Sequence, residues 1–301
     1  MPAAGFDLRT VRIRGFDRDA PWKNVALPAV IPMALWAALG IVDRFRPDVV
    51  LGMGGYVMAP AVAAARMRRI PYVLHEKDVR PGLATRYFAA GAAAVCTTLP
   101  GTDARLPGVR TELTGVPLRD GFEPRTPDVP ARRLLVTGGS QGARRLNEAT
   151  WSALDRLCAR FEDVVHVAGE QGKEGVARHS HMRYRGMAFA DDMAALMGQA
   201  DLVVSRAGVG TIAEAAAVGL PMILVPGTFG GGHQEENAAA MVATGAAIRL
   251  ADEELTGDSL VRAIESLDDG RLRAMARASA AAGRPDAAMR VLRVLHRVTR
   301  E

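Results

Sequence analysis

Cysteine, lysine and aromatic residues are scarce in this sequence. Its 301 residues include two cysteines, Cys96 and Cys158, and aromatic side chains make up 5% of the chain. Two cysteines so far apart exclude a disulfide framework and suit a reducing compartment. Lysine occurs only at positions 23, 77 and 173, so the net charge of +5 comes from arginine. Because no alternation of basic and aromatic residues accompanies the arginines, nucleic acid is not an expected partner.

Long uncharged runs are also scarce. Residues 26–42 are nearly all apolar, but a membrane-spanning helix needs roughly 20 such residues. Met1–Thr10 lack the basic start and apolar core of a secretory signal. Arginines flank the apolar segment on both sides and Trp36 lies within it. Two interpretations follow: a buried core helix, or a surface that dips into an anionic lipid leaflet.

Short apolar runs alternate with helical segments along the chain, a pattern that predicts an α/β protein with parallel sheets. In the first half, we expect strands at residues 6–14, 48–51, 72–75, 93–98 and 112–115. A proline-rich polar stretch then predicts a domain boundary. The expected division is a first domain at 1–119, a linker at 120–131 and a second domain at 132–301 that includes the C-terminal helices.

Two groups of candidate site residues lie in the first domain. Gly54 and Gly55 form a turn after a strand, where the absence of a Cβ lets the backbone approach a ligand. His75 and Glu76 stand at the carboxyl end of the next strand, where open α/β sheets bind their ligands. A His–Glu pair suits general acid–base catalysis, but a histidine hydrogen-bonded to a neighbouring loop is as common.

The second domain opens with a strand at 133–137 that runs into a glycine turn and a helix at 143–160. Gly138, Gly139 and Gly142 are the glycines of this turn. Ser140 either caps the helix or adds a hydroxyl to a phosphate cradle. Such a turn before a helix presents unpaired N–H groups to an anion, so we expect a nucleotide site.

The stretch 200–237 contains a second strand, turn and helix of this kind, with Thr211 expected to open the helix. Glu214 has two candidate roles. It is the N3 residue of a capping box in which Thr211 is the N-cap, or it accepts hydrogen bonds from the two hydroxyls of a ribose. The second role is worth more, because a charge-assisted hydrogen bond contributes roughly 1.5 to 3 kcal/mol. We therefore expect Glu214 to dominate nucleoside recognition.

No metal or cofactor is expected. His179 and His181 lack further ligands at zinc spacing. Asp191 and Asp192 precede a predicted helix, where carboxylates complement the helix dipole.

Five motifs in order along the chain resemble the MurG family: GMGGYV at 52–57, HEKDVRPGLATR at 75–86, VTGGSQGARRLNEA at 136–149, FADDMA at 189–194, and RAGVGTIAEAAAVGLPMILVP followed by HQEENA from 206. This resemblance implies a GT-B fold, in which two Rossmann-like domains face each other across a cleft. It implies an inverting hexosyltransferase that moves N-acetylglucosamine from UDP-N-acetylglucosamine to lipid I, giving lipid II for the cell wall. The enzyme would act at the cytoplasmic face of the membrane as a peripheral protein.

The resemblance also implies site residues. Glu214 matches the ribose-binding glutamate of the family, and Gly54 and Gly55 would face the diphosphate of the acceptor. His75 and Glu76 are the candidates for the catalytic base. The other expected donor contacts are Asp78, Arg119, Ser140, Ala190, Val209, Gly210, Thr211 and Gln234.

Two departures from the family pattern stand out. Asp78 replaces an asparagine. The family also opens with a strand and a GGTGGH loop, which this sequence does not contain. We therefore expect the first domain to be incomplete at its N-terminus, either through a wrongly placed start or in a degenerate copy. Two alternative functions remain at this point: a non-catalytic nucleotide-sugar-binding remnant and a sugar-nucleotide epimerase.

Overall fold

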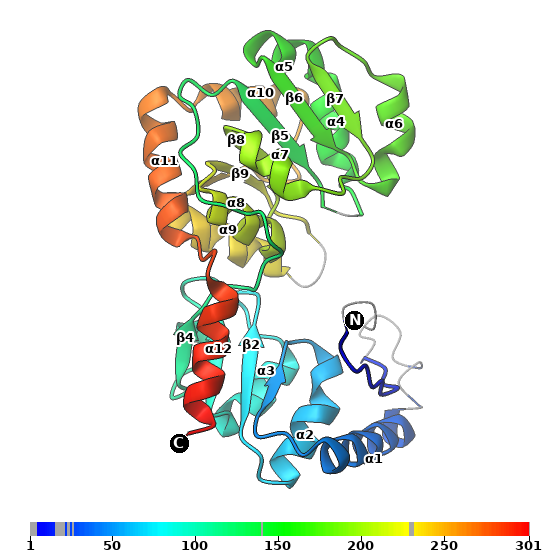
Figure 1. Ribbon diagram of the computed structural model, residues 1–301. Coiled ribbons are helices and arrows are strands. Elements are labelled where there is room, and N and C mark those ends of the chain that lie inside the picture. Colours follow the sequence, from blue (N-terminus) through cyan, green and yellow to red (C-terminus); the bar gives the residue numbers. More distant parts are fainter. Residues whose placement is uncertain are drawn as a thin grey trace. The chain divides into compact units, whose positions relative to one another are not determined.

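The computed structural model describes residues 5–15, 22, 25, 27–139, 141–228 and 232–300 (Figure 1). The chain forms two compact units. The first comprises Met1–Thr97, Thr102–Leu113 and Met289–Glu301. The second comprises Thr98–Gly101 and Thr114–Ala288. Each unit contains one parallel sheet, which confirms the predicted class of two α/β domains.

The first unit is built on a four-stranded parallel sheet with the order β1-β2-β3-β4. The strands are β1 (Val50–Gly52), β2 (Tyr72–Glu76), β3 (Ala94–Thr97) and β4 (Thr111–Leu113). The first three helices are α1 (Leu27–Phe45), α2 (Ala59–Met67) and α3 (Leu83–Phe88), and α2 carries a proline in its first turn, where the missing N–H has no helical partner to lose. Short 3-10 turns lie at Tyr56–Met58, Ala89–Gly91 and Asp103–Arg105.

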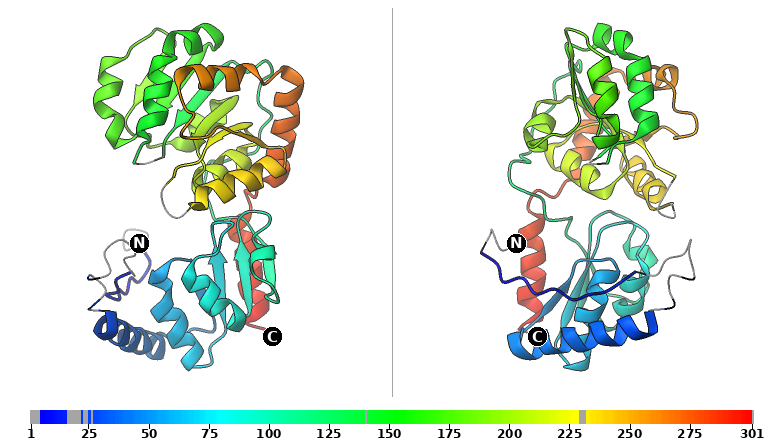
Figure 2. Two further views of the ribbon diagram at one scale, coloured as in Figure 1. Left: turned by 180° about the vertical axis from the view of Figure 1, so that it is seen from behind. Right: turned by 90° about the vertical axis from the view of Figure 1, so that its right-hand side faces the viewer.

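The last helix of the chain, α12 (Ala287–Val298), packs on the first sheet (Figures 1 and 2). Val291, Val294 and Val298 form one apolar stripe of this helix and join Val73 and Cys96 in a buried cluster. This placement differs from the predicted division, which kept residues to 301 with the second domain. The physical reason is that the valine stripe of α12 buries its apolar surface against β2 and β3.

The second unit contains a six-stranded parallel sheet with the order β10-β9-β8-β5-β6-β7. The strands are β5 (Arg133–Thr137), β6 (Asp163–Val167), β7 (Tyr184–Met187), β8 (Leu202–Arg206), β9 (Met222–Val225) and β10 (Ala247–Arg249). The chain moves outward from β5 through β6 to β7, then returns to the other side of β5 with β8. This is the doubly wound Rossmann order, and its switch point lies between β5 and β8.

Helices cover both faces of the second sheet (Figure 2). The main core joins the sheet to α4 (Arg144–Ser152), α5 (Leu154–Arg160), α10 (Gly257–Glu265) and α11 (Asp269–Ala282). The remaining helices are α6 (Lys173–Arg178), α7 (Met193–Gln199), α8 (Val209–Val218) and α9 (His233–Ala243), with a 3-10 turn at Glu170–Gly172. The helix predicted at 143–160 is therefore two helices, since the backbone leaves the α conformation at Ala153.

The predicted linker at 120–131 belongs to the second unit. One buried carboxylate makes several of the hydrogen bonds that hold it in place. Asp201, 1% exposed, accepts hydrogen bonds from the backbone N–H groups of Asp128, Arg132 and Arg133 at 3.0 to 3.1 Å and from the guanidinium of Arg125 at 3.2 Å. The strand predicted at residues 6–14 is wrong, because those residues have no regular secondary structure and pair with no strand among the described residues.

Candidate functional site

A cavity of about 240 Å³ lies at the carboxyl edge of the second sheet. Its lining comes from the ends of β5, β6 and β7, from the starts of α7 and α8, and from Arg119. This is the switch-point edge, where open parallel sheets bind ligands. Of the described residues that line it, Arg119 and Glu214 carry charge. The full lining is Arg119, Thr137, Gly139, Val167, Ala188, Phe189, Ala190, Met193, Met197, Gly210, Thr211 and Glu214.

The glycine turn after β5 is held in a conformation that requires glycine. Gly139 and Gly142 have φ of +78° and +82°. A Cβ on Gly142 would lie 2.3 Å from the carbonyl oxygen of Ala168, and a Cβ on Gly138 would lie 2.5 Å from the backbone nitrogen of Ala143. The predicted turn is thus packed backbone against backbone, and the N–H groups of its three glycines are bonded within the protein: Gly138 to the carbonyl oxygen of Val167, Gly139 to the hydroxyl of Thr137 and Gly142 to the carbonyl oxygen of Gly139. Ser140 lies outside the described residues.

Helix α8 begins two residues earlier than predicted. Its N-cap is Gly208, and no side chain caps the helix. Val209, Gly210 and Thr211 form the first turn, so the predicted capping box between Thr211 and Glu214 is wrong. Ile212 and Ala215 of this helix are fully buried. Uncapped N–H groups at a helix start are suited to binding an anion.

Glu214 is consequently released from any capping role. Its side chain lines the cavity and accepts no hydrogen bond from the part of the chain that the structure describes. Burial raises the pKa of this carboxyl group, and the positive charge of Arg119 counteracts the rise. A partly desolvated carboxylate without a hydrogen-bond donor, next to a cation in a cavity, is typical of a ligand-binding site.

The far wall of the cavity is apolar. Phe189, 64% exposed, and Ala190 follow β7, and Met193 and Met197 are on α7. Asp192 caps α7 by accepting from the backbone N–H of Ala195 at 2.8 Å, as the sequence indicated. The sequence reasoning missed Phe189 as a wall residue. The sequence feature that could have identified it is a large aromatic residue between the end of a strand and the N-cap of the next helix.

Gln234 lies at the start of α9 and not in the cavity lining. Its side-chain Oε1 accepts from the backbone N–H of Gly227 at 2.8 Å, which ties the helix to the end of β9. The side-chain amide nitrogen makes no hydrogen bond within the described ranges and stays available to a ligand.

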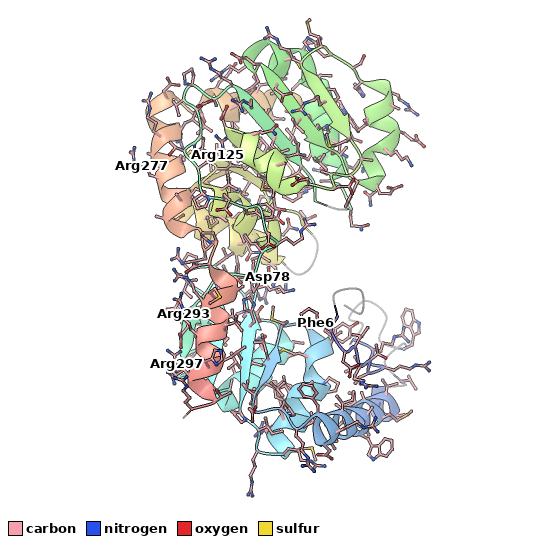
Figure 3. The ribbon with its side chains drawn as sticks, viewed as in Figure 1. Phe6, Asp78, Arg125, Arg277, Arg293 and Arg297 are labelled. Carbon is pink, nitrogen blue, oxygen red and sulfur yellow. The ribbon has the colours of Figure 1, made fainter. Side chains whose placement is uncertain are left out.

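The residues predicted in the first unit have mixed settings. Gly54 and Gly55 both have positive φ, +80° and +71°, so this turn needs glycine as expected. His75 is fully buried in β2. Glu76 is 5% exposed, and its carboxylate accepts from the backbone N–H groups of Lys77 at 3.0 Å and Gly82 at 3.1 Å. Glu76 therefore holds the loop that follows it, and Asp78 lies on that loop, half-buried (Figure 3).

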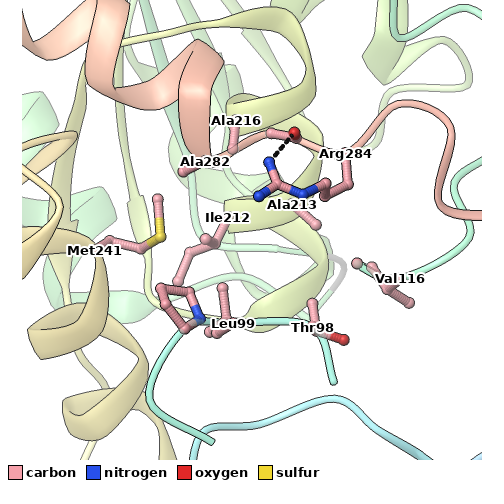
Figure 4. A pocket seen from close by; sticks show the side chains of 12 residues that line it. Thr98, Leu99, Val116, Ile212, Ala213, Ala216, Met241, Ala282 and Arg284 are labelled. Carbon is pink, nitrogen blue, oxygen red and sulfur yellow. Dashed lines mark hydrogen bonds between the residues drawn. The ribbon is translucent and has the colours of Figure 1, made fainter. Parts of the chain in front are cut away.

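Another hollow in the second unit is much smaller, about 20 Å³, which is room for about one water molecule. Its lining is mostly apolar, and the guanidinium of Arg284 donates to the carbonyl oxygen of Gly283 at 2.7 Å (Figure 4). This hollow is too small for a nucleotide. The described residues contain no cluster of His, Cys, Asp and Glu suited to a metal ion.

Helix α1 has one packed face and one bare face. Ala34, Ala38 and Val42 are buried against α2. Met33 and Trp36 are 70% and 80% exposed. Within the described ranges, α1 is the one helix long and apolar enough to cross a membrane, with a mean hydropathy of 1.4 over Pro28–Phe45, of which 17% is buried. Arg9, Arg44 and Arg68 border the hollow beside Trp36.

Comparisons with known proteins agree with this arrangement. Models of glycosyltransferase family 28 match residues 1–97 (N-terminal domain) and 133–291 (C-terminal domain). A protein of Syntrophotalea carbinolica, named UDP-N-acetylglucosamine–N-acetylmuramyl-(pentapeptide) pyrophosphoryl-undecaprenol N-acetylglucosamine transferase, is 39% identical over 99% of this chain and 86% of its own length. The protein of the same name from Alkalilimnicola ehrlichii is 40% identical over 98% of this chain and 85% of its own length.

Solved structures show the same relationship. MurG of Acinetobacter baumannii aligns with a TM-score of 0.75 and 27% identity over 96% of this chain and 84% of that chain. The UDP-GlcNAc 2-epimerase of Neisseria meningitidis, solved with UDP-GlcNAc, aligns with a TM-score of 0.64 and 14% identity over 91% of this chain and 82% of that chain. At this identity the epimerase shares the fold alone.

Proposed function

The chain belongs to glycosyltransferase family 28, and from that premise we propose that the cavity beside Glu214 holds the UDP of a UDP-N-acetylglucosamine donor. The protein is a UDP-N-acetylglucosamine-dependent glycosyltransferase that transfers the sugar to lipid I and so forms lipid II. Its donor and acceptor are the two substrates in the name of its relatives.

Glu214 carries the proposal for the donor. It is a carboxylate in the cavity lining that neither caps its helix nor accepts a hydrogen bond from the described residues. A ribose offers two adjacent hydroxyl donors, which match the two oxygens of a carboxylate. The uncapped first turn of α8 and the glycine turn after β5 then face the diphosphate. Ser140, Gln234 and Ala190 stay proposed contacts to the donor substrate. Gln234 would use its amide nitrogen, and Ala190 would lie beside the nucleobase.

We propose the following chemical step. The hydroxyl of the acceptor sugar attacks the anomeric carbon of the donor, a new C–O bond forms, and the bond to UDP breaks with inversion. The leaving diphosphate gains negative charge, and the helix start of α8 and Arg119 stabilise it without rearrangement. The proton of the attacking hydroxyl goes to a base, for which His75 and Glu76 stay the proposed candidates. Since Glu76 binds loop N–H groups, we also propose that it positions the loop 77–82 against the acceptor.

The proposal for the acceptor concerns the first unit. Gly54 and Gly55 leave backbone exposed after β1, as a diphosphate contact requires. The bare face of α1, with Met33 and Trp36, is proposed to dip into the cytoplasmic leaflet that carries the lipid, while Arg44 at its border attracts anionic headgroups. Arg9 and Arg68 are paired with Asp7 and Asp43. Sedimentation with anionic vesicles tests this: Trp36→Ser should weaken vesicle binding, whereas Met182→Ser, which removes a 93% exposed apolar side chain from the second unit, should not.

The donor site is tested by titration with UDP and with 2′-deoxy-UDP. Glu214→Ala should weaken UDP binding roughly 100-fold, because two charge-assisted hydrogen bonds of about 1.5 kcal/mol or more each are lost. The effect of the same substitution on 2′-deoxy-UDP should be clearly smaller, since that ligand lacks one of the two hydroxyls. Glu265→Gln, at an exposed position of α10, is the matched control.

Equal losses for both ligands, or no loss for UDP, would refute the ribose contact. Turnover is read separately, as transfer of labelled sugar to lipid I. Interconversion of the free donor without an acceptor would identify an epimerase, and donor binding without transfer would identify a non-catalytic remnant.

A further inference from the structure

A buried chain of four polar side chains lies behind the glycine turn of the second unit. Trp151 Nε1 is 3.0 Å from the hydroxyl of Tyr184, which is 3.1 Å from His166 Nδ1. His166 Nε2 is 3.0 Å from Asn147 Oδ1, and Asn147 Nδ2 is 2.8 Å from the carbonyl oxygen of Ala168. His166 and Asn147 are 0% and 2% exposed. No other feature of the proposed function accounts for this chain.

The direction of donation along the chain follows from its two ends. The indole of Trp151 can only donate, and the carbonyl oxygen of Ala168 can only accept. The amide of Asn147 donates to Ala168 through Nδ2, so its Oδ1 faces Nε2 of His166 and can only accept. Nδ1 of the neutral histidine is therefore an acceptor, and the hydroxyl of Tyr184 donates to it while accepting from the indole. His166 then carries its proton on Nε2 and donates to Asn147, whose amide donates to Ala168. Each group is satisfied in one direction, so a change at any member reaches the next one.

The members of this hydrogen-bonded chain come from three different elements of the second unit. Asn147 and Trp151 are one helical turn apart on α4, His166 is on β6 and Tyr184 on β7. The four side chains thus tie the helix that follows the glycine turn to the two strands beside it.

The last acceptor of the hydrogen-bonded chain, Ala168, lies against the glycine turn. Ala168 and Gly169 pack directly against Gln141 and Gly142, because a Cβ on Gly169 would lie 2.1 Å from the backbone nitrogen of Gly142. On the other side, Gly138 donates to the carbonyl oxygen of Val167 at 3.4 Å. The backbone of 167–169 is therefore the surface on which the turn rests, and Asn147 anchors that surface to the start of α4.

We propose that His166, Tyr184 and Trp151 are positioning residues that act through Asn147 to hold the backbone of Gly138, Gly139 and Gly142 where the donor diphosphate binds. This assignment rests on the proposed function, since it deepens the donor site. The assignment predicts that the four hydrogen-bonded side chains affect binding of the diphosphate and not of the nucleoside. They support the backbone beneath the turn, and none of them lines the cavity beside Glu214.

The test compares the affinities of UDP and uridine in matched variants of the full chain. Asn147→Ala, His166→Gln and Tyr184→Phe each interrupt the chain at a different member. Tyr184→Phe keeps the ring volume and removes only the hydroxyl that joins His166 to Trp151. Glu148→Gln, an exposed neighbour on α4, is the control. Thermal unfolding of each variant confirms that it is folded under the conditions of the titration.

We expect UDP affinity to fall about tenfold in Asn147→Ala and by a factor of three or more in the other two variants, with uridine affinity changed less than twofold. In steady state, KM for the donor should rise while KM for the acceptor stays unchanged. If UDP and uridine weaken together, the chain has only a structural role, and the assignment is overturned. Unchanged UDP affinity in Tyr184→Phe and His166→Gln also overturns it. Wild-type protein that binds neither ligand would overturn the donor site itself.

Discussion

His166 should make the stability of the second unit depend on pH. The ring is fully buried, and burial, with a smaller contribution from the charge of nearby His179, lowers its pKa from 6.5 to about 4. In the unfolded chain the histidine regains an ordinary pKa of about 6.5. Between pH 4 and 6.5 the unfolded state therefore binds more protons than the folded state, so stability falls as the pH is lowered through this window. Above pH 6.5 the histidine has no effect.

The two pKa values set the magnitude. Moving from pH 7.5 to pH 5 should remove about 2 kcal/mol of unfolding free energy through this histidine, and the loss should level off near 3 kcal/mol below pH 4. The geometry explains the sign, because a proton on Nδ1 would face the hydroxyl of Tyr184, which already accepts from Trp151. That hydroxyl would have to accept twice and leave its own proton without a partner.

Urea unfolding followed by tryptophan fluorescence, at pH 7.5, 6.5, 5.5 and 5.0, measures the effect. His166→Gln is not titratable at this position, so the wild type should lose about 2 kcal/mol more than the variant between pH 7.5 and 5. His296→Gln, at an exposed position of α12, should keep the wild-type pH dependence. NMR titration of the ring protons reads the pKa directly. Equal slopes in the wild type and His166→Gln, or a ring that titrates near 6.5, would refute the reasoning.

Three further predictions concern the scaffold of the site. Gly142→Ala places a side chain on a backbone with a φ of +82° and against the carbonyl oxygen of Ala168. It should lower the stability by about 2 kcal/mol or more in thermal unfolding and reduce UDP binding. Gly198→Ala, in open space on α7, is the control and should raise the stability by about 0.5 to 1 kcal/mol in the same measurement. Asp201→Asn leaves one acceptor oxygen for four donors and should cost about 2 to 4 kcal/mol in urea unfolding; a loss as small as that of Asp258→Asn, a 69% exposed control, would contradict the anchoring role of Asp201. Asp192→Ala removes the cap of α7 and should cost about 1 kcal/mol, a change that thermal unfolding detects and that Asp191→Ala should not reproduce.

Local features of the site were predictable from the sequence because they depend on neighbours in the chain. The glycines at 54, 55, 139 and 142 all have positive φ, a conformation that other residues rarely adopt, so their spacing marked the two turns in advance. Asp192 was predicted at a helix start for the same kind of reason, since a cap acts within one turn.

Features that depend on packing between distant segments were predicted less well. The start of α8 was placed at Thr211 from its side chain, but the helix begins at Val209 with Gly208 as its N-cap. The tail was assigned to the second domain by its position in the chain, yet the valine stripe of α12 is buried against the first sheet. No local signal carries the placement of α12, because it depends on which apolar surface lies opposite.

The sequence by itself determined the class of fold, the two glycine turns, the family resemblance and the importance of Glu214, since each depends on residue type and short spacing. Only the tertiary structure decided the surroundings of Glu214, which has no capping partner and lines a cavity with Arg119. The structure alone also joined Asn147, His166 and Tyr184, which are 18 or more positions apart within α4, β6 and β7, into one hydrogen-bonded chain. The physical reason is that hydrogen bonds and burial act over a few ångströms in space, and the order of strands in a sheet decides which side chains come that close.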